Sequence, residues 1–318
     1  MATPTDIEED AFMFPSLQLN VETERRGMHQ RNSSPYEVQR PNVLDDICLG
    51  LLLQARIDRV VHGRSTKEEG GTPTTLVVFG FRFHGLNRKR RFKEATITIV
   101  FEDEKKPGTK RDPEVVALWP NGDFTLGKTP VQVENKDRGE VGGDAGVPLG
   151  GTGAQLGTHY VRTWERTESF ERTNRATLTG SIILDTTHRE WGNNNAVTLT
   201  LCEDDKAKTS IVTDLRAAVL LERQNDADIF TAKVDMKAKG DFAYNVFSGI
   251  RNLSRFSPAN DPVRFKPGVQ YIRRRTLHPA FETKLNIEID KERMSVDQLE
   301  KVAGVLGSTV LSSEASAT

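Results

Sequence analysis

Apolar and polar residues alternate along much of this chain, and the alternation is clearest in 229–239. One side of that segment is apolar and the other is mostly charged. The apolar side holds Phe230, Ala232, Val234, Met236 and Ala238, and the polar side holds Thr231, Lys233, Asp235, Lys237 and Lys239. Successive side chains of a β-strand point to opposite faces of its sheet. The segment is therefore predicted to be a strand with a core on one face and water on the other.

Further segments repeat this period of two, and each predicts a strand. They are 47–57, with Ile47, Leu49, Leu51, Leu53, Ala55 and Ile57 on one face, and then 77–83, 95–101, 197–201, 215–221 and 281–289. Between Trp119 and Phe124 lies Pro120-Asn121-Gly122-Asp123. Asn-Gly pairs accept the positive φ angles of tight turns, so this sequence predicts a hairpin.

Signals for helices are few. Ser295 and Gln298 have the spacing of a capping box, and Met294 and Leu299 have that of a hydrophobic staple. They predict a short helix over roughly 296–306. A second helix is expected over 242–253, although Gly249 weakens it.

Short strands joined by polar turns predict an all-β fold, with two sandwich-like antiparallel β lobes and a short C-terminal helix. The expected divisions are a disordered N-terminal segment 1–42, a first β lobe 43–138, a Gly-rich linker or loop 139–157, a second β lobe 158–290, and a short helix with a frayed tail 291–318. Eight glycines fall between 139 and 157, so this stretch can bury little. A single sandwich with one long excursion is the alternative.

Composition narrows the class of protein. The 318 residues include 44 Lys plus Arg and 45 Asp plus Glu, which gives a net charge of −1 and no bulk attraction to nucleic acid or anionic membranes. Cys48 and Cys202 are too few for a disulfide scaffold or a four-thiolate zinc site. The acidic first ten residues lack the positive region of a secretory signal. We expect a soluble cytoplasmic protein, with the nucleus as an alternative.

No sequence motif indicates an enzyme active site or a cofactor site. The stretch 151–157 departs from the dinucleotide-binding fingerprint at its third glycine, and no Gly-Lys-Ser/Thr follows it. Six histidines are scattered without metal-ligand spacing, and neither cysteine has a neighbouring histidine in sequence. We therefore predict no catalytic residue, no metal site and no cofactor.

The candidate interaction residues are basic and aromatic. The run Arg88, Lys89, Arg90, Arg91 falls between two predicted strands, where it either binds a partner or keeps a turn solvated. Arg273, Arg274 and Arg275 form a similar run. Trp164 is the aromatic candidate for an interaction, and Trp119 and Trp191 are further aromatic residues worth probing.

The region 158–184 is rich in Thr with interspersed aromatic residues and could form one long strand or a hairpin. Membrane-inserting hairpins alternate apolar and polar positions. Here Tyr160, Trp164 and Phe170 share a parity with arginines, which would cost about 2–4 kcal/mol each on a lipid face. An exposed strand of a soluble sandwich is the favoured interpretation.

Several blocks resemble a group of uncharacterised proteins from filamentous ascomycete fungi. They are Thr74–Phe83, Arg91–Ile99, Asp112–Val116, Leu215–Arg223 and Asp261–Phe265, and the similarity covers about 43–270. The resemblance implies a fungal, intracellular origin. That group has no assigned activity, so no functional residue carries over.

The sequence therefore predicts a non-catalytic β-sandwich protein that binds another protein or a small ligand. One alternative is an enzyme with a dispersed acid–base site in a barrel or between lobes, for which His84, His159 and His188 are the first candidates. A second is a protein that inserts a β-hairpin into a membrane.

Overall fold

The computed structural model describes residues 30–48, 50–65, 71–86, 90–143, 160–187, 190–204, 208, 210–240, 260–273, 276–277, 279–305 and 311–313. Contacts within the chain divide it into two units. The first comprises 1–127 and 175–318, and the second is 128–174. The second unit contains the C-terminal part of one long strand and the N-terminal part of the next.

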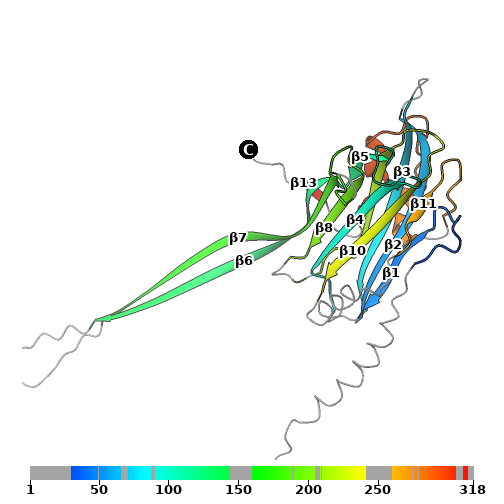
Figure 1. Ribbon diagram of the computed structural model, residues 1–318. Helices are drawn as coiled ribbons and strands as arrows, with labels where there is room; N and C mark the ends of the chain where they lie inside the picture. The colour runs from blue at the N-terminus through cyan, green and yellow to red at the C-terminus, as the bar shows by residue number, and fades with distance from the viewer. Residues whose placement is uncertain are drawn as a thin grey trace, which may run out of the picture. The chain divides into compact units, whose positions relative to one another are not determined.

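The fold is all-β, as the alternation predicted, and its strands form two antiparallel sheets (Figure 1). The first sheet has the order β1 (Asn42–Cys48), β2 (Leu51–Arg64), β3 (Pro73–Gly85), β9 (Asp214–Glu222) and β12 (Gly304–Val305), and β5 (Glu114–Trp119) also pairs with β9. The second has the order β11 (Val263–Phe265), β10 (Phe230–Lys239), β4 (Glu94–Asp103), β8 (Ala196–Cys202), β7 (Tyr160–Ile183), β6 (Gly122–Gly143) and β13 (Leu311–Ser313).

The main core lies between the two sheets. β10 shows the predicted pattern, since its apolar positions are buried or half-buried and its charged positions are exposed. Every second residue of β3 and β9 points into this core, and β4 and β8 contribute the facing side chains. The largest of these side chains are Phe79, Phe81, Phe83 and Phe101.

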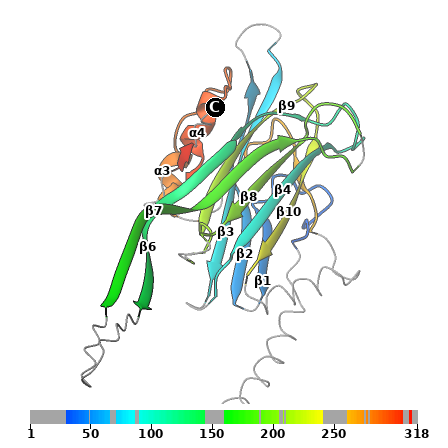
Figure 2. The ribbon, with the colours of Figure 1, turned by 90° about the vertical axis from the view of Figure 1, so that its left-hand side faces the viewer.

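A smaller apolar cluster covers the opposite face of the first sheet. The C-terminal segment includes η1 (Pro279–Phe281), α3 (Glu282–Leu285) and α4 (Asp297–Val302), and it contributes Ile289, Met294 and residues of α4 to this cluster. Figure 2 shows α3 and α4 together on one side of the strands. Leu76 and Val78 of β3 are buried there against Met294, Leu299 and Val302. β3 and β9 are therefore buried on both faces, which explains their nearly continuous runs of apolar residues.

Each sheet contains strands from both halves of the chain. β3 pairs with β9 in the first sheet, and β4 pairs with β8 and β10 in the second. The predicted lobes 43–138 and 158–290 therefore both contribute strands to each sheet. The Gly-rich stretch 139–157 connects β6 and β7, which are neighbours in one sheet. Its first residues belong to β6, and 144–157 lies outside the described residues.

Two predicted strands differ from the structure. The segment 47–57 is not one strand, because Gly50 adopts a φ of 75° and the chain reverses between β1 and β2. The segment 281–289 is not a strand either. Its buried residues Phe281, Leu285 and Ile289 are four apart, a helical spacing that the alternating Thr283 and Ile287 obscured.

The C-terminal helix exists but is shorter than predicted. α4 ends at Val302, just before Gly304, and no side-chain cap forms at its N-terminus. The helix expected over 242–253 lies outside the described residues. The turn at 120–123 is present, with a φ of 99° at Gly122, but it joins β5 of one sheet to β6 of the other and so forms no hairpin.

Part of the N-terminal segment is held by hydrogen bonds to a later part of the chain. The backbone N–H groups of Gln30 and Asn32 donate to the side chains of Asn260 and Asp261, and the N–H of Gln39 donates to the carbonyl of Arg264. These hydrogen bonds hold 30–41 against the 260–269 segment.

Candidate functional site

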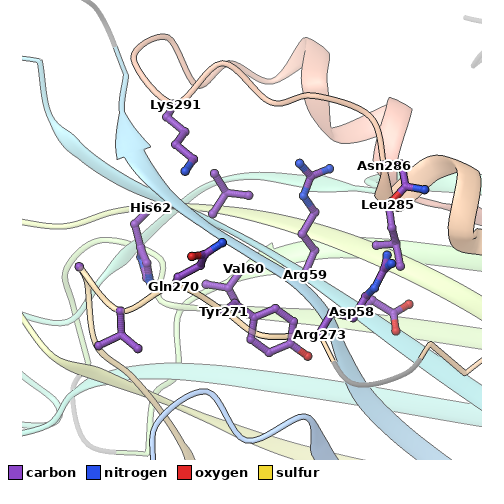
Figure 3. Close-up of a pocket in the computed structure, with 13 residues that line it drawn as sticks. Asp58, Arg59, Val60, His62, Gln270, Tyr271, Arg273, Leu285, Asn286 and Lys291 are labelled. Carbon is purple, nitrogen blue, oxygen red and sulfur yellow. The ribbon is translucent and has the colours of Figure 1, made fainter.

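A pocket of about 670 Å³ lies between β2 and the chain that follows β11 (Figure 3). One wall is the end of β2, and the other walls come from residues more than two hundred positions later. The lining residues are Asp58, Arg59, Val60, Val61, His62, Gly268, Val269, Gln270, Tyr271, Arg273, Leu285, Asn286 and Lys291. Most of these side chains are polar or charged, unlike the largely apolar lining of a typical drug-sized pocket.

A β-bulge shapes the β2 wall. Ile57 pairs with Phe79 and Arg59 pairs with Val78, which leaves Asp58 as an extra residue in β2. The bulge shifts the alternation so that Asp58 leaves the main core and lies over β3 at Gly80. A Cβ atom on Gly80 would be only 2.8 Å from Asp58 Oδ2, so the missing side chain leaves room for the carboxylate.

Asp58 reaches across Gly80 to Arg216 on β9. Arg216 Nε donates to Asp58 Oδ2 at 3.1 Å, and both side chains are 0% exposed. Burial raises the pKa of Asp58, and Arg216 opposes that shift. Burial also lowers the pKa of Arg216 to about 10, with Asp58 opposing it. A buried charge is costly unless it is paired, so the loss of either residue would leave the other as an uncompensated buried charge.

Arg216 also fastens the C-terminal segment to the sheet. Its Nη1 donates to the carbonyls of Phe281 and Val302, each at 3.3 Å, and its guanidinium lies 3.8 Å from the centre of the Phe281 ring. Lys284 Nζ donates to the carbonyl of Ala303 at 2.7 Å. These bonds position the segment that supplies Leu285, Asn286 and Lys291 to the pocket.

Three cationic side chains line the pocket. Arg59 Nη1 donates to the carbonyl of Ile287 at 2.6 Å, and Arg273 Nη2 forms an ion pair with Glu282 at 2.8 Å. Within the residues that the structure describes, neither Arg59 nor Lys291 has a carboxylate at ion-pair distance. Burial lowers the pKa of Arg59, and the nearby charge of Arg273 lowers it further.

His62 is held in one orientation by its neighbours. Its Nε2 lies 2.9 Å from Gln39 Nε2, and its Nδ1 lies 2.9 Å from Thr75 Oγ1. Since the Gln39 amide nitrogen can only donate, His62 Nε2 accepts and the ring proton lies on Nδ1. Burial lowers the pKa of His62 to about 4, and Arg223 and Lys291 lower it as well. The ring is therefore neutral at pH 7, with both nitrogens engaged by the protein.

Tyr271 closes the pocket beside the bulge. Its hydroxyl donates to the carbonyl of Ile57. Burial raises the pKa of this hydroxyl, and the charge of Asp58 raises it further. Tyr271 therefore remains protonated and keeps the loop 268–273 against β2.

Of the basic run predicted from the sequence at 88–91, the structure describes Arg90 and Arg91, and neither lines the pocket. Arg91 Nε forms an ion pair with the buried carboxylate of Glu203 at 3.0 Å, which gives it a structural role. Arg90 precedes β4 in the chain and lies next to Gly50. Arg88 and Lys89 lie outside the described residues, as does the side chain of Trp164 on β7.

The other aromatic and basic candidates are dispersed. Trp119 packs against both apolar clusters, and Trp191 is 69% exposed, with Lys110 Nζ 5.3 Å from its ring centre. Of the basic run 273–275, Arg273 lines the pocket, and Arg274 and Arg275 are outside the described part of the chain.

Of the three acid–base candidates, His84 alone lies in the described residues. His84 is half-buried on β3, and His159 and His188 are among the residues that the structure does not describe. Across the described ranges, no three His, Cys, Asp or Glu side chains gather as a metal site would require. None of the helices in those ranges is long and apolar enough to cross a membrane.

Sequence reasoning missed the pocket, although one signal was present. Apolar core positions follow odd numbers from Leu51 to Ile57 and then move to Val60, with Asp58 at the change of phase. Such a shift in an otherwise regular strand indicates a bulge, and bulges often occur next to functional sites. Nothing in the sequence indicated which later segment would face it.

Comparisons with known proteins give no family. No protein-family model and no curated protein matches the chain. Among solved structures, the chain is similar to the NetB toxin of Clostridium perfringens in its membrane-inserted form. The identity is 7% and the TM-score 0.26, over 74% of this chain and 93% of that one. Overlap at this TM-score does not establish a shared fold, so the function is argued from the pocket.

Proposed function

We propose that this chain is a non-catalytic β-sandwich protein that binds a small ligand in the pocket between β2 and 268–291. The observation that carries the proposal is the pocket itself, because about 670 Å³ falls within the roughly 300–1,000 Å³ of small-molecule sites. Its walls are also fixed. The Asp58–Arg216 pair, the Tyr271 hydroxyl and Arg59 all bond to backbone or buried groups, and a preformed site avoids much of the entropy cost of binding.

Binding is favoured over catalysis by the state of the titratable groups. Asp58 is already paired with Arg216, and His62 has both ring nitrogens occupied and a pKa of about 4. A general base works best with a pKa near the operating pH and a free path to its substrate. These two residues meet neither condition.

A ligand screen with pocket variants tests the proposal. Gln270 is exposed and its side chain reaches into the pocket (Figure 3). Gln270→Trp should fill much of the space, and Gln270→Ala should leave it open. The full chain would be screened against a library of metabolites by thermal shift. At least one compound should stabilise the wild type and Gln270→Ala but not Gln270→Trp. Compounds that stabilise all three proteins equally would bind elsewhere, and that result would contradict the proposal.

A further inference from the structure

The charges around the pocket point to the kind of ligand. Two of the ionic groups at its walls are neutralised within the protein, since Asp58 is paired with Arg216 and Arg273 with Glu282. His62 is uncharged at pH 7. Arg59 and Lys291 are then the lining charges with no opposite charge beside them among the described residues. The pocket therefore carries an excess of positive charge, although the whole chain has a net charge of −1.

Arg59 and Lys291 lie on opposite walls of the pocket. Arg59 comes from β2 and Lys291 from the segment between α3 and α4, and Figure 3 shows both side chains extending into the space between these elements. Arg59 is half-buried and one of its nitrogens is used by the carbonyl of Ile287. The guanidinium has five N–H donors in a fixed fork, so several remain for a ligand. The ammonium of Lys291 has three donors and no hydrogen-bond partner within the described part of the chain.

We propose that Arg59 and Lys291 form an oxyanion subsite, and that the ligand of the pocket is a small molecule carrying a carboxylate or a phosphate. This inference rests on the proposed function and specifies the chemistry of its ligand. A planar guanidinium binds two oxygens of either group, and an ammonium adds a second charge from the other side. Asn286 and Gln270 supply amide groups for the uncharged part of the same molecule.

The neighbouring groups agree with this assignment. The positive charge of Arg273 already acts on Arg59, and that of Lys291 acts on His62. Like charges held close together in a partly buried site are relieved when an anion binds between them. A cationic ligand would add to the repulsion, and the one lining carboxylate is already committed to Arg216.

Inorganic phosphate is the simplest probe, and its binding can be followed by ³¹P NMR line broadening on the full chain at fixed ionic strength. Lys291→Gln is the main variant, because the Lys291 side chain has no hydrogen bond to lose in the described residues, and its backbone carbonyl, which accepts from the N–H of Arg64, is unchanged by the substitution. Arg59→Gln is the second, and Lys233→Gln, an exposed lysine on β10, is the matched control. Phosphate should saturate the wild type and the control, and each pocket variant should weaken binding at least about tenfold. Citrate should displace the phosphate if carboxylates are also accepted, whereas retention of phosphate against citrate would identify a phosphate-selective site.

Two results would overturn the oxyanion subsite. One is the absence of saturable binding of both phosphate and citrate, and the other is equal binding by wild type, Lys291→Gln and Arg59→Gln. The experiments distinguish a pocket that binds no oxyanion from a pocket that binds no ligand at all. A neutral compound that Gln270→Trp blocks and the two charge variants leave unaffected would preserve the proposed function and remove the oxyanion subsite.

Discussion

The buried pair of Asp58 and Arg216 gives the sharpest prediction about stability. Arg216→Met keeps much of the side-chain volume but leaves the Asp58 carboxylate buried without its partner. Both side chains are 0% exposed, and removing one member of such a pair costs about 3–5 kcal/mol. The variant also loses two hydrogen bonds to the carbonyls of Phe281 and Val302 and the contact with the Phe281 ring. The expected loss of unfolding free energy is therefore at least about 3 kcal/mol.

Urea unfolding at pH 7, followed by circular dichroism, measures this loss as a lower midpoint with a comparable slope. Arg64→Met is the matched control, because Arg64 and Asp226 are exposed partners and such pairs contribute no more than about 1 kcal/mol. Removing the unpaired buried charge of Asp58 should restore part of the stability. The unfolding free energy of the double variant Asp58→Asn, Arg216→Met should therefore be about 1–3 kcal/mol higher than that of Arg216→Met alone. A loss below about 1 kcal/mol for Arg216→Met, or strictly additive effects in the double variant, would refute this reasoning.

Two further predictions concern residues next to that pair and beside the pocket. His62 has a pKa of about 4 in the folded protein and 6.5 when unfolded. Its neutral ring therefore contributes to the free energy of unfolding in full above pH 6.5, and this contribution is lost as the pH falls toward 4. At about 1.4 kcal/mol per pKa unit, the contribution amounts to about 3 kcal/mol. His62→Gln should flatten the dependence of the urea midpoint on pH between 6.5 and 4, and an unchanged dependence would contradict the burial of this ring. Gly80→Ala places a Cβ 2.8 Å from Asp58 Oδ2 and should cost about 1–3 kcal/mol in the same assay, with a smaller cost once Arg216→Met has already disrupted the pair.

Most of the sandwich could be predicted from period-two patterns. Strands β4, β8 and β10 lie where the alternation indicated, because an antiparallel sheet with one wet face imposes that period on its sequence. The period-two pattern was less informative where a strand is buried on both faces or where the buried residues lie in or beside a helix. β3 is apolar on both faces because the C-terminal segment covers the side away from the main core. In 281–289, apolar residues or Thr stand at every second position, which suggested a strand. This alternation concealed the spacing of four between the buried residues Phe281, Leu285 and Ile289.

The pocket could not be predicted because it depends on tertiary contacts. Asp58 marks the bulge, yet its partner Arg216 is 158 residues away and its space depends on Gly80 of a third strand. Arg59 and Lys291 look like ordinary surface charges in the sequence. Only the fold shows that they occupy two walls of one cavity, whose lining carboxylate, Asp58, is paired with Arg216.

The central claim is that the pocket binds a small ligand, and the most direct measurement compares one stabilising compound on wild type, Gln270→Ala and Gln270→Trp. A compound at one hundred times its dissociation constant should add about 2.7 kcal/mol to the folded state. The account predicts a rise in unfolding temperature of several degrees for wild type and Gln270→Ala, and no rise for Gln270→Trp. An equal rise in all three proteins would contradict it, because the compound would then bind outside the pocket.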